Sequence, residues 1–211
     1  MLFVSTGRCG TTRIAQILRQ SLPANYAVVH QVRFARLANI AGNLLYYLGG
    51  GEAVKRALFS LVTDRYAQGR PFITTDPLTA MIIPEDFVAS PDVCIVHVMR
   101  EPDSFAKSFF DLSRMRFKSF VAHALVPMWQ PGIWPLENLS RGRVLEKYKR
   151  VAALKKEFFE TRYARNPNYV SFKMKDLFTS DALEKVVNGF FSESIRIPEG
   201  ELSRKANQTS D

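Results

Sequence analysis

Short apolar runs and longer amphipathic stretches alternate along the chain. Between the apolar runs, apolar residues recur at helical spacing. Such alternation is typical of an α/β protein, and we expect a three-layer α/β/α fold around a central parallel sheet of about five strands. The apolar runs predict strands at Leu2 to Ser5, Tyr26 to His30, Pro71 to Thr75, Val93 to Met99 and Tyr169 to Phe172.

Two stretches in the second half of the chain read as helices. The longer predicted helix covers residues 143–164. A second helix is predicted from Thr179 to Phe191, after the last strand. The first has an apolar face that includes one lysine, and we interpret it as a packing helix with a solvated basic face. That face is made by Val144, Tyr148, Val151, Ala152, Lys155 and Phe159.

The first predicted strand runs directly into Ser5-Thr6-Gly7-Arg8-Cys9-Gly10-Thr11-Thr12, and an amphipathic helical pattern follows from Arg13. A buried strand that turns through glycines into a helix N-terminus presents unpaired amide groups to an anion. An NTP-hydrolysing P-loop requires a lysine after its last glycine, and here Thr11 follows Gly10. The two glycines also do not make a dinucleotide fingerprint. The loop therefore predicts an anion site with Arg8 inside the turn.

Cys9 admits a second interpretation of the same loop. A thiolate at a helix N-terminus beside Arg8 could attack a phosphoester. Cysteine phosphatases separate their cysteine and arginine by more residues than separate Cys9 from Arg13. This spacing favours Cys9 as a small residue that fits a tight turn.

A second candidate anion site follows the strand predicted at Val93 to Met99. Arg100 ends this strand, and Pro102 and Asp103 suit the first turn of a helix. Ser108, two turns into that helix, can then converge with Arg100. A guanidinium binds phosphate with a planar fork and keeps its charge. The alternatives are a salt bridge at the sheet edge for Arg100 and a solvated hydroxyl for Ser108.

Together these two segments resemble sulfotransferases that use 3′-phosphoadenosine-5′-phosphosulfate (PAPS). In that family a Lys or Arg, a small residue, a glycine and two threonines follow the first strand and bind the 5′-phosphosulfate. An Arg and a Ser with seven residues between them, as here, bind the 3′-phosphate. The resemblance implies a P-loop-like fold that binds PAPS, or its product 3′-phosphoadenosine-5′-phosphate (PAP), through Arg8, Cys9, Gly10, Thr11, Thr12, Arg13, Arg100 and Ser108.

A third segment, Asn168 to Leu177, is similar to the last strand of that family and to the turn into the following helix. Met174 and Lys175 stand where many members have a tyrosine and a glutamate. The tyrosine lies near the adenine in some members, so this likeness is the loosest of the three.

The resemblance implies transfer of a sulfuryl group to a hydroxyl or an amine, without a metal. Arg8 would stabilise the charge on the departing phosphate. His30, at the end of the second predicted strand, is the first candidate general base, and Asp76 competes with it. Their structural alternatives are a hydrogen-bonded histidine and a turn residue before Pro77. We expect His97 to lie in the core, and His123 receives no role.

The residue blocks 33–67 and 114–142 are not explained by the sheet. The first holds two helical stretches around Gly49-Gly50-Gly51, and the second is rich in aromatic residues and proline. Both could be ordinary helical and loop cover. As blocks they are the candidates for cover over an acceptor site, where the acceptor is a small molecule, a lipid or a carbohydrate.

Composition agrees with one globular domain over residues 1–211, because the chain is long enough for a substantial core and 46% hydrophobic. The 29 Lys and Arg against 20 Asp and Glu give a net charge of +9, which attracts anions. No aromatic and basic repeat, helix-turn-helix spacing or zinc-knuckle pattern points to nucleic acid.

The chain shows no signal-peptide pattern and no apolar run long enough to span a membrane. With two cysteines that are not expected to pair, we predict a cytoplasmic protein, unless the chain is a trimmed lumenal domain. Two other functions stay open: a PAP- or anion-binding regulator without catalysis, and a small-molecule kinase of P-loop type. The missing lysine after Gly10 argues against the kinase.

Overall fold

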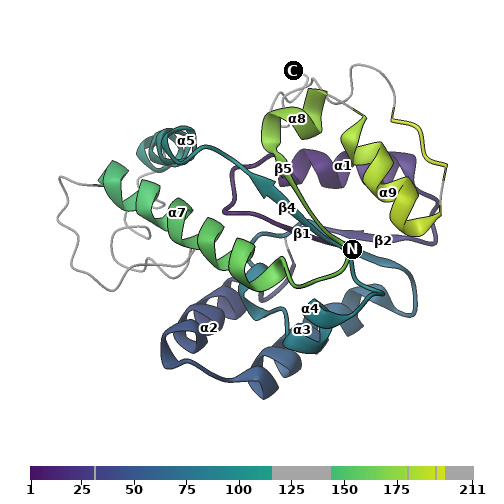
Figure 1. Cartoon of the computed structure of the whole chain (residues 1–211), viewed down its shortest axis with the longest axis horizontal. Helices are drawn as coiled ribbons and strands as arrows, with labels where there is room; N and C mark the ends of the chain where they lie inside the picture. Colours follow the sequence, from purple (N-terminus) through teal and green to yellow (C-terminus); the bar gives the residue numbers. More distant parts are fainter. Residues whose placement is uncertain (31, 116–143, 180, 193, 198–211) are drawn as a thin grey trace.

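Five parallel strands form one central sheet in the order β2-β3-β1-β4-β5 (Figure 1). The computed structural model describes residues 1–30, 32–115, 144–179, 181–192 and 194–197, without the side chains of residues 112–115, 144 and 179. All five predicted strands are found, and the predicted α/β fold is confirmed. The strands are β1 (Leu2–Val4), β2 (Ala27–Val29), β3 (Phe72–Thr74), β4 (Ile95–Met99) and β5 (Tyr169–Lys173).

Helices cover both faces of this sheet. On one side lie α1 (Thr11–Ser21), α8 (Met174–Thr179) and α9 (Ala182–Phe191) (Figure 1). On the other lie α2 (Ala35–Leu48), α3 (Glu52–Ala67), the short 3-10 helix η1 (Ala80–Ile82) and α4 (Glu85–Ala89). The described residues also form α5 (Pro102–Met115) and α7 (Val144–Tyr163).

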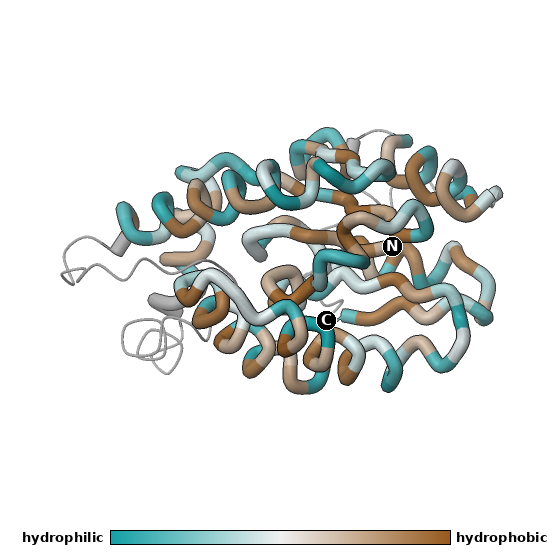
Figure 2. The backbone as a smooth tube through the Cα atoms, turned by 60° about the horizontal axis from the view of Figure 1, so that its bottom comes forward, coloured by the Kyte–Doolittle hydropathy of each residue, from teal (hydrophilic) through white to brown (hydrophobic). Residues whose placement is uncertain are grey.

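The alternation of side chains along β1 builds a core on each face of the sheet. Phe3 packs on the α1 side, and Leu2 and Val4 pack on the α2 side. All three are buried. Along the helices, hydrophobic and hydrophilic positions alternate, as expected for helices that bury one side (Figure 2).

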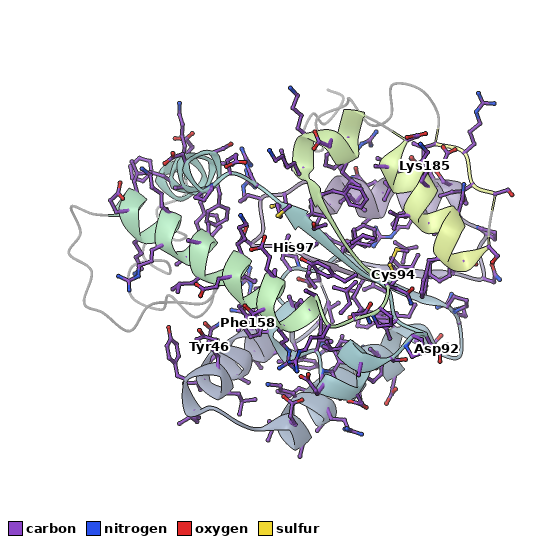
Figure 3. All side chains as sticks on the ribbon, viewed as in Figure 1. Tyr46, Asp92, Cys94, His97, Phe158 and Lys185 are labelled. Atoms are coloured by element: carbon purple, nitrogen blue, oxygen red, sulfur yellow. The ribbon has the colours of Figure 1, made fainter. Side chains whose placement is uncertain are left out.

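A third apolar cluster joins α5 to α7. Phe109 of α5 meets Tyr148 of α7 edge to face, with 5.0 Å between ring centroids. The second half of α7 reaches the sheet, where the ring centroids of Phe159 and His97 lie 5.1 Å apart. Figure 3 labels His97 and the neighbouring Phe158 of α7. The helix after β4 is therefore held to the sheet through α7.

The helix boundaries follow the sequence closely except after β5. α5 begins at Pro102 and α7 spans Val144–Tyr163, as predicted. The expected helix from Thr179 to Phe191 is wrong at its start, because the chain becomes helical at Met174 and forms α8 before α9. The i, i+3 spacing of Met174 and Leu177 directs both toward the core, while Lys175 between them is exposed.

Because all strands are parallel, their carboxyl ends meet at one edge of the sheet. Arg8, His30, Asp76 and Arg100 follow β1, β2, β3 and β4 respectively. The four residues therefore lie along this edge, as the sequence predicts.

Candidate functional site

Three residues with positive φ wind the loop between β1 and α1. Gly7 (89°), Arg8 (57°) and Gly10 (73°) occupy the left-handed region, which glycine enters freely and arginine enters at a cost. The Gly7 amide donates a hydrogen bond to the Ser5 hydroxyl at 3.1 Å. The loop thereby folds back on itself before the chain enters α1.

The start of α1 offers amide groups at its positive end. Gly10 occupies the N-cap, and no side chain caps the helix there. The Ile14 amide makes the first helical hydrogen bond, to the Gly10 carbonyl at 3.0 Å. The amides of Thr11, Thr12 and Arg13 precede that bond and have no acceptor within the helix. Such a helix end attracts anions.

Gly10 also lies against the ring of Phe178 in α8. A Cβ atom at this position would come within 2.5 Å of the Phe178 Cε2 atom. Both its positive φ and this close approach favour glycine over any residue with a Cβ atom.

Hydrogen bonds join the two segments that the sequence singles out. The Arg8 Nε donates to the Ser108 hydroxyl at 3.3 Å, and the Arg100 Nη1 donates to the Arg8 carbonyl at 2.6 Å. The Arg100 Nε donates to Ser104 at 3.0 Å. Ser108 and Arg100 thus both contact Arg8, and Ser104 is a further hydroxyl that sequence reasoning missed. Its position one helical turn before Ser108 could have indicated it.

The convergence of two guanidinium groups affects Arg8. Burial lowers the pKa of Arg8, and the positive charge of Arg100 lowers it further, while Cys9 acts in the opposite direction. The negative charge of an anion bound beside Arg8 would raise this pKa and so offset both effects.

His30 bridges the start of α1 and the end of β3. Its Nδ1 lies 3.2 Å from the Thr75 carbonyl and 3.0 Å from the Thr75 hydroxyl, and its Nε2 lies 2.9 Å from the Thr12 hydroxyl. A carbonyl oxygen only accepts, so these contacts favour a proton on Nδ1, and the lone pair of Nε2 then accepts from the Thr12 hydroxyl. Burial lowers the pKa of His30, partly opposed by the charge of Asp76, so the neutral form prevails at neutral pH.

Asp76 uses both carboxylate oxygens to bind the main chain. Its Oδ2 accepts from the Val32 amide at 2.7 Å, and its Oδ1 accepts from the Leu78 amide at 2.9 Å. The side chain is buried, with 2% exposed. Asp76 thereby ties the turn after β3 to the segment after β2, which carries His30.

Lys155 of α7 is fully buried next to this turn. Its Nζ donates to the Pro77 carbonyl at 3.2 Å and lies 5.3 Å from the centroid of the Phe159 ring. Burial lowers the pKa of Lys155 to about 7, partly opposed by electrostatic interactions with Cys9 and Asp76. The sequence places this lysine on the packing face of the helix, but does not indicate that its amine reaches the turn after Asp76.

The remaining loop residues are buried to different degrees. The Cys9 thiol has no exposed surface and donates to the Gly7 carbonyl at 3.2 Å, and burial raises its pKa. Cys9 and Cys94 are both free and buried. Arg13 is buried and its Nη1 donates to Gln16 at 3.4 Å. Thr11 is buried, while Thr12 is exposed at the helix start.

Two other candidates lie apart from these contacts. Met174 packs partly buried against the core on the α1 side of the sheet. His97 is buried, as predicted, and its Nδ1 lies 2.9 Å from the Tyr169 hydroxyl. Burial lowers the pKa of His97 to about 4.

A cavity of about 490 Å³ lies at the opposite, amino edge of the sheet. Phe72 and Val93, which border the starts of β3 and β4, contribute to its wall together with Phe87. The length of the strands lies between this cavity and the site residues at the carboxyl edge.

His123 and residues 116–142 of the proposed acceptor cover lie outside the described residues. The other cover block, residues 33–67, forms α2 and α3. Within the described ranges, no three or more His, Cys, Asp or Glu side chains gather as a metal site would require. In the same ranges, no helix combines the length and apolar character that crossing a membrane requires.

The chain has no significant match among protein-family models, among curated proteins or among solved structures. The assignment of a function therefore depends on the two motifs and the contacts between them.

Proposed function

We propose that this protein is a PAPS-dependent sulfotransferase. One observation supports it above the others: Arg8 of the first motif is hydrogen-bonded to Ser108 of the second, and Arg100 is hydrogen-bonded to Arg8. The two segments that resemble the 5′- and 3′-phosphate sites of the family are far apart in sequence and adjacent in space. A ligand with phosphates at both positions would bridge them.

In this proposal the donor's 5′-phosphosulfate binds the amides at the start of α1, with Arg8 and the hydroxyls of Thr11 and Thr12. The 3′-phosphate binds Arg100 and Ser108. The guanidinium of Arg8 then exchanges its hydroxyl partner for the donor. Arg100 keeps the loop in place through the Arg8 carbonyl.

PAPS supplies an activated sulfuryl group, whose sulfur forms a bond to the acceptor oxygen or nitrogen as its bond to the phosphate oxygen breaks. His30 Nε2 takes the proton that the acceptor loses. Arg8 and the α1 amides stabilise the negative charge that grows on the departing phosphate, which leaves as part of PAP. The acceptor is a hydroxyl or an amine of a small molecule, a lipid or a carbohydrate.

His30 is the better base of the two candidates. Its Nε2 lone pair accepts from the Thr12 hydroxyl, which lies 2.9 Å away at the start of α1 and can rotate away from it. Both oxygens of Asp76 are already hydrogen-bonded to amides. Asp76 is therefore a positioning residue that holds the segment bearing His30.

Calorimetry with PAP, ADP and ATP with Mg²⁺ tests the proposal first. We expect PAP to bind most tightly, and Arg100→Ala to weaken it at least tenfold, about 1.4 kcal/mol. Arg70→Ala is the matched control, because this exposed arginine follows α3 and precedes β3 at the amino edge. A preference for ATP with Mg²⁺ would overturn the proposal in favour of a kinase.

Turnover is tested by PAP release from PAPS over a panel of hydroxyl and amine acceptors. Sulfated product that requires His30 supports the transferase. Tight PAP binding with no product from any acceptor would contradict it and leave a PAP-binding regulator.

A further inference from the structure

The polarity of α2 is reversed relative to an ordinary surface helix. Its packed side holds small residues and two fully buried asparagines, Asn39 and Asn43. Its outward side exposes Leu37 (56%), Leu44 (48%) and Leu48 (79%). Helices of globular proteins normally turn leucine inward and amides outward.

The three leucines form one continuous line along the helix. Positions 37, 44 and 48 are separated by seven and four residues, a spacing that returns to the same side of a helix. Ala41, between Leu37 and Leu44 on that side, is also apolar. We call Leu37, Leu44 and Leu48 the α2 stripe.

Exposed apolar side chains are concentrated around this stripe. Nine large ones are exposed among the described residues, and eight of them lie between positions 34 and 61. They include Phe34 just before α2, and Val54 and Leu61 on α3. Figure 1 shows α2 and α3 together, on the side of the molecule away from α1, α8 and α9. A concentration of this kind marks an interaction surface, whereas scattered exposed residues need no explanation.

Positive charge accompanies the apolar surface. Residues 33–70 contain six Lys and Arg and two Asp and Glu. Arg33 and Arg36 are exposed at the start of α2, and the Arg33 guanidinium lies 5.1 Å from the centroid of the Phe34 ring. The stripe therefore begins beside two arginines.

Apolar side chains next to arginine suit the boundary of a lipid bilayer. The leucines can enter the acyl region while the guanidinium groups meet anionic headgroups. A second copy of the chain fits less well, because each copy has a net charge of +9 and the same arginines would border the contact.

We propose that the α2 stripe docks this protein on the surface of an anionic lipid bilayer, with α2 lying in the plane of the interface. The proposal does not depend on sulfuryl transfer. It is tested without any donor or acceptor, so its failure is distinguishable from failure of the proposed function.

Sedimentation with phosphatidylcholine vesicles, with and without phosphatidylserine, measures this docking. We expect binding to the anionic vesicles that declines as salt is added. Leu44→Gln and Leu48→Gln should each weaken the partition at least tenfold, about 1.4 kcal/mol. Leu145→Gln is the matched control, because Leu145 is 41% exposed and belongs to α7 rather than to α2 or α3. Circular dichroism of each variant checks that it is folded.

Three outcomes would overturn the proposal. The first is equal vesicle binding by Leu44→Gln and Leu145→Gln, or no binding by the folded wild-type chain. The second is a dimer in lipid-free solution that Leu44→Gln converts to a monomer, which would assign the stripe to a second copy. The third uses Trp129 and Trp134, the two tryptophans of the chain. A shift of their emission on Leu44→Gln without lipid would assign the stripe to contact with residues 116–143.

Discussion

Two threonines determine which nitrogen of His30 can accept a proton. Thr75 offers a carbonyl to Nδ1, which favours the proton there, and Thr12 meets Nε2 with a rotatable hydroxyl. Burial lowers the pKa of this histidine below its ordinary value. The unprotonated base is therefore already present at neutral pH, as catalysis of acceptor deprotonation requires.

His30→Gln tests this role because the amide can keep a hydrogen bond to Thr12 but cannot act as a base. We expect kcat to fall by about 10² to 10⁴ while the Kd for PAP stays unchanged. In the wild type, kcat/KM should decline only below the ordinary histidine pKa of about 6.5. If His30→Gln kept the wild-type kcat and the same decline of kcat/KM at low pH, His30 would not be the base, and Asp76 would be the remaining candidate.

Lys155 makes the stability of the fold depend on pH. Its pKa is about 7 in the folded protein, against 10.5 for an ordinary lysine. Between these values the unfolded chain binds more protons than the folded one, so the free energy of unfolding rises with pH. The slope from this one group approaches about 1.4 kcal/mol per pH unit.

Lys155→Met should remove that slope. Urea unfolding from about pH 7 upward should then show a stability that rises less steeply in Lys155→Met than in the wild type. The neighbouring Lys156→Met is the control, because Lys156 is half exposed and pairs with Glu160. Parallel pH profiles for the wild type and Lys155→Met would mean that the amine is not buried with a lowered pKa.

At the scale of elements, the contact of the β1–α1 loop with α8 depends on the absence of a side chain at Gly10. The ring of Phe178 occupies the space where a Cβ would stand. Because Gly10 also caps α1, any displacement of the loop changes the direction of the amides that we assign to the phosphosulfate.

Gly10→Ala should therefore destabilise the protein and weaken PAP binding. Gly69→Ala is a matched control, because Gly69 has nearly the same φ (75° against 73°) but no atom within 4 Å of an added Cβ. Both variants lose about 1–2 kcal/mol of stability because alanine is strained at a left-handed φ. The further loss of stability in Gly10→Ala then measures the clash with Phe178. Phe178→Leu in the Gly10→Ala background should recover part of that further loss. Equal losses at Gly10 and Gly69, measured by thermal unfolding, would show that the clash has no effect.

The elements that the sequence predicts correctly are those whose pattern is local. Buried parallel strands such as β4 are continuous apolar runs, and Pro102 marks the start of α5. The start of α8 at Met174 was not predicted, because Met174 and Leu177 suit either a strand end or a helix. The reversed polarity of α2 could not be predicted either, because helical spacing alone does not say which side of a helix faces the core.

At the scale of the whole molecule, the carboxyl edge of the sheet follows from sequence because parallel strand order places Arg8, His30, Asp76 and Arg100 together. The contacts among these residues do not follow. Arg8 and Ser108 are 100 residues apart, and Lys155 and Pro77 are 78 apart. Only tertiary packing of α5 and α7 on the sheet brings these two pairs into contact, so the contact of Lys155 with the turn after Asp76 was missed. Ser104 was missed although it lies only four residues after its partner Arg100.

The two faces of the sheet share the same strands, so the core clusters on either side should unfold together. We expect calorimetry to show one cooperative transition for the described α/β unit. PAP should raise the transition temperature, because the ligand contacts both the β1–α1 loop and α5. At a hundredfold excess of PAP over Kd, the free energy of unfolding should increase by about 2.7 kcal/mol. Arg100→Ala should lose most of that gain while Arg70→Ala keeps it. Two transitions, with PAP shifting only one, would contradict a single domain and confine the phosphate site to one part of the chain.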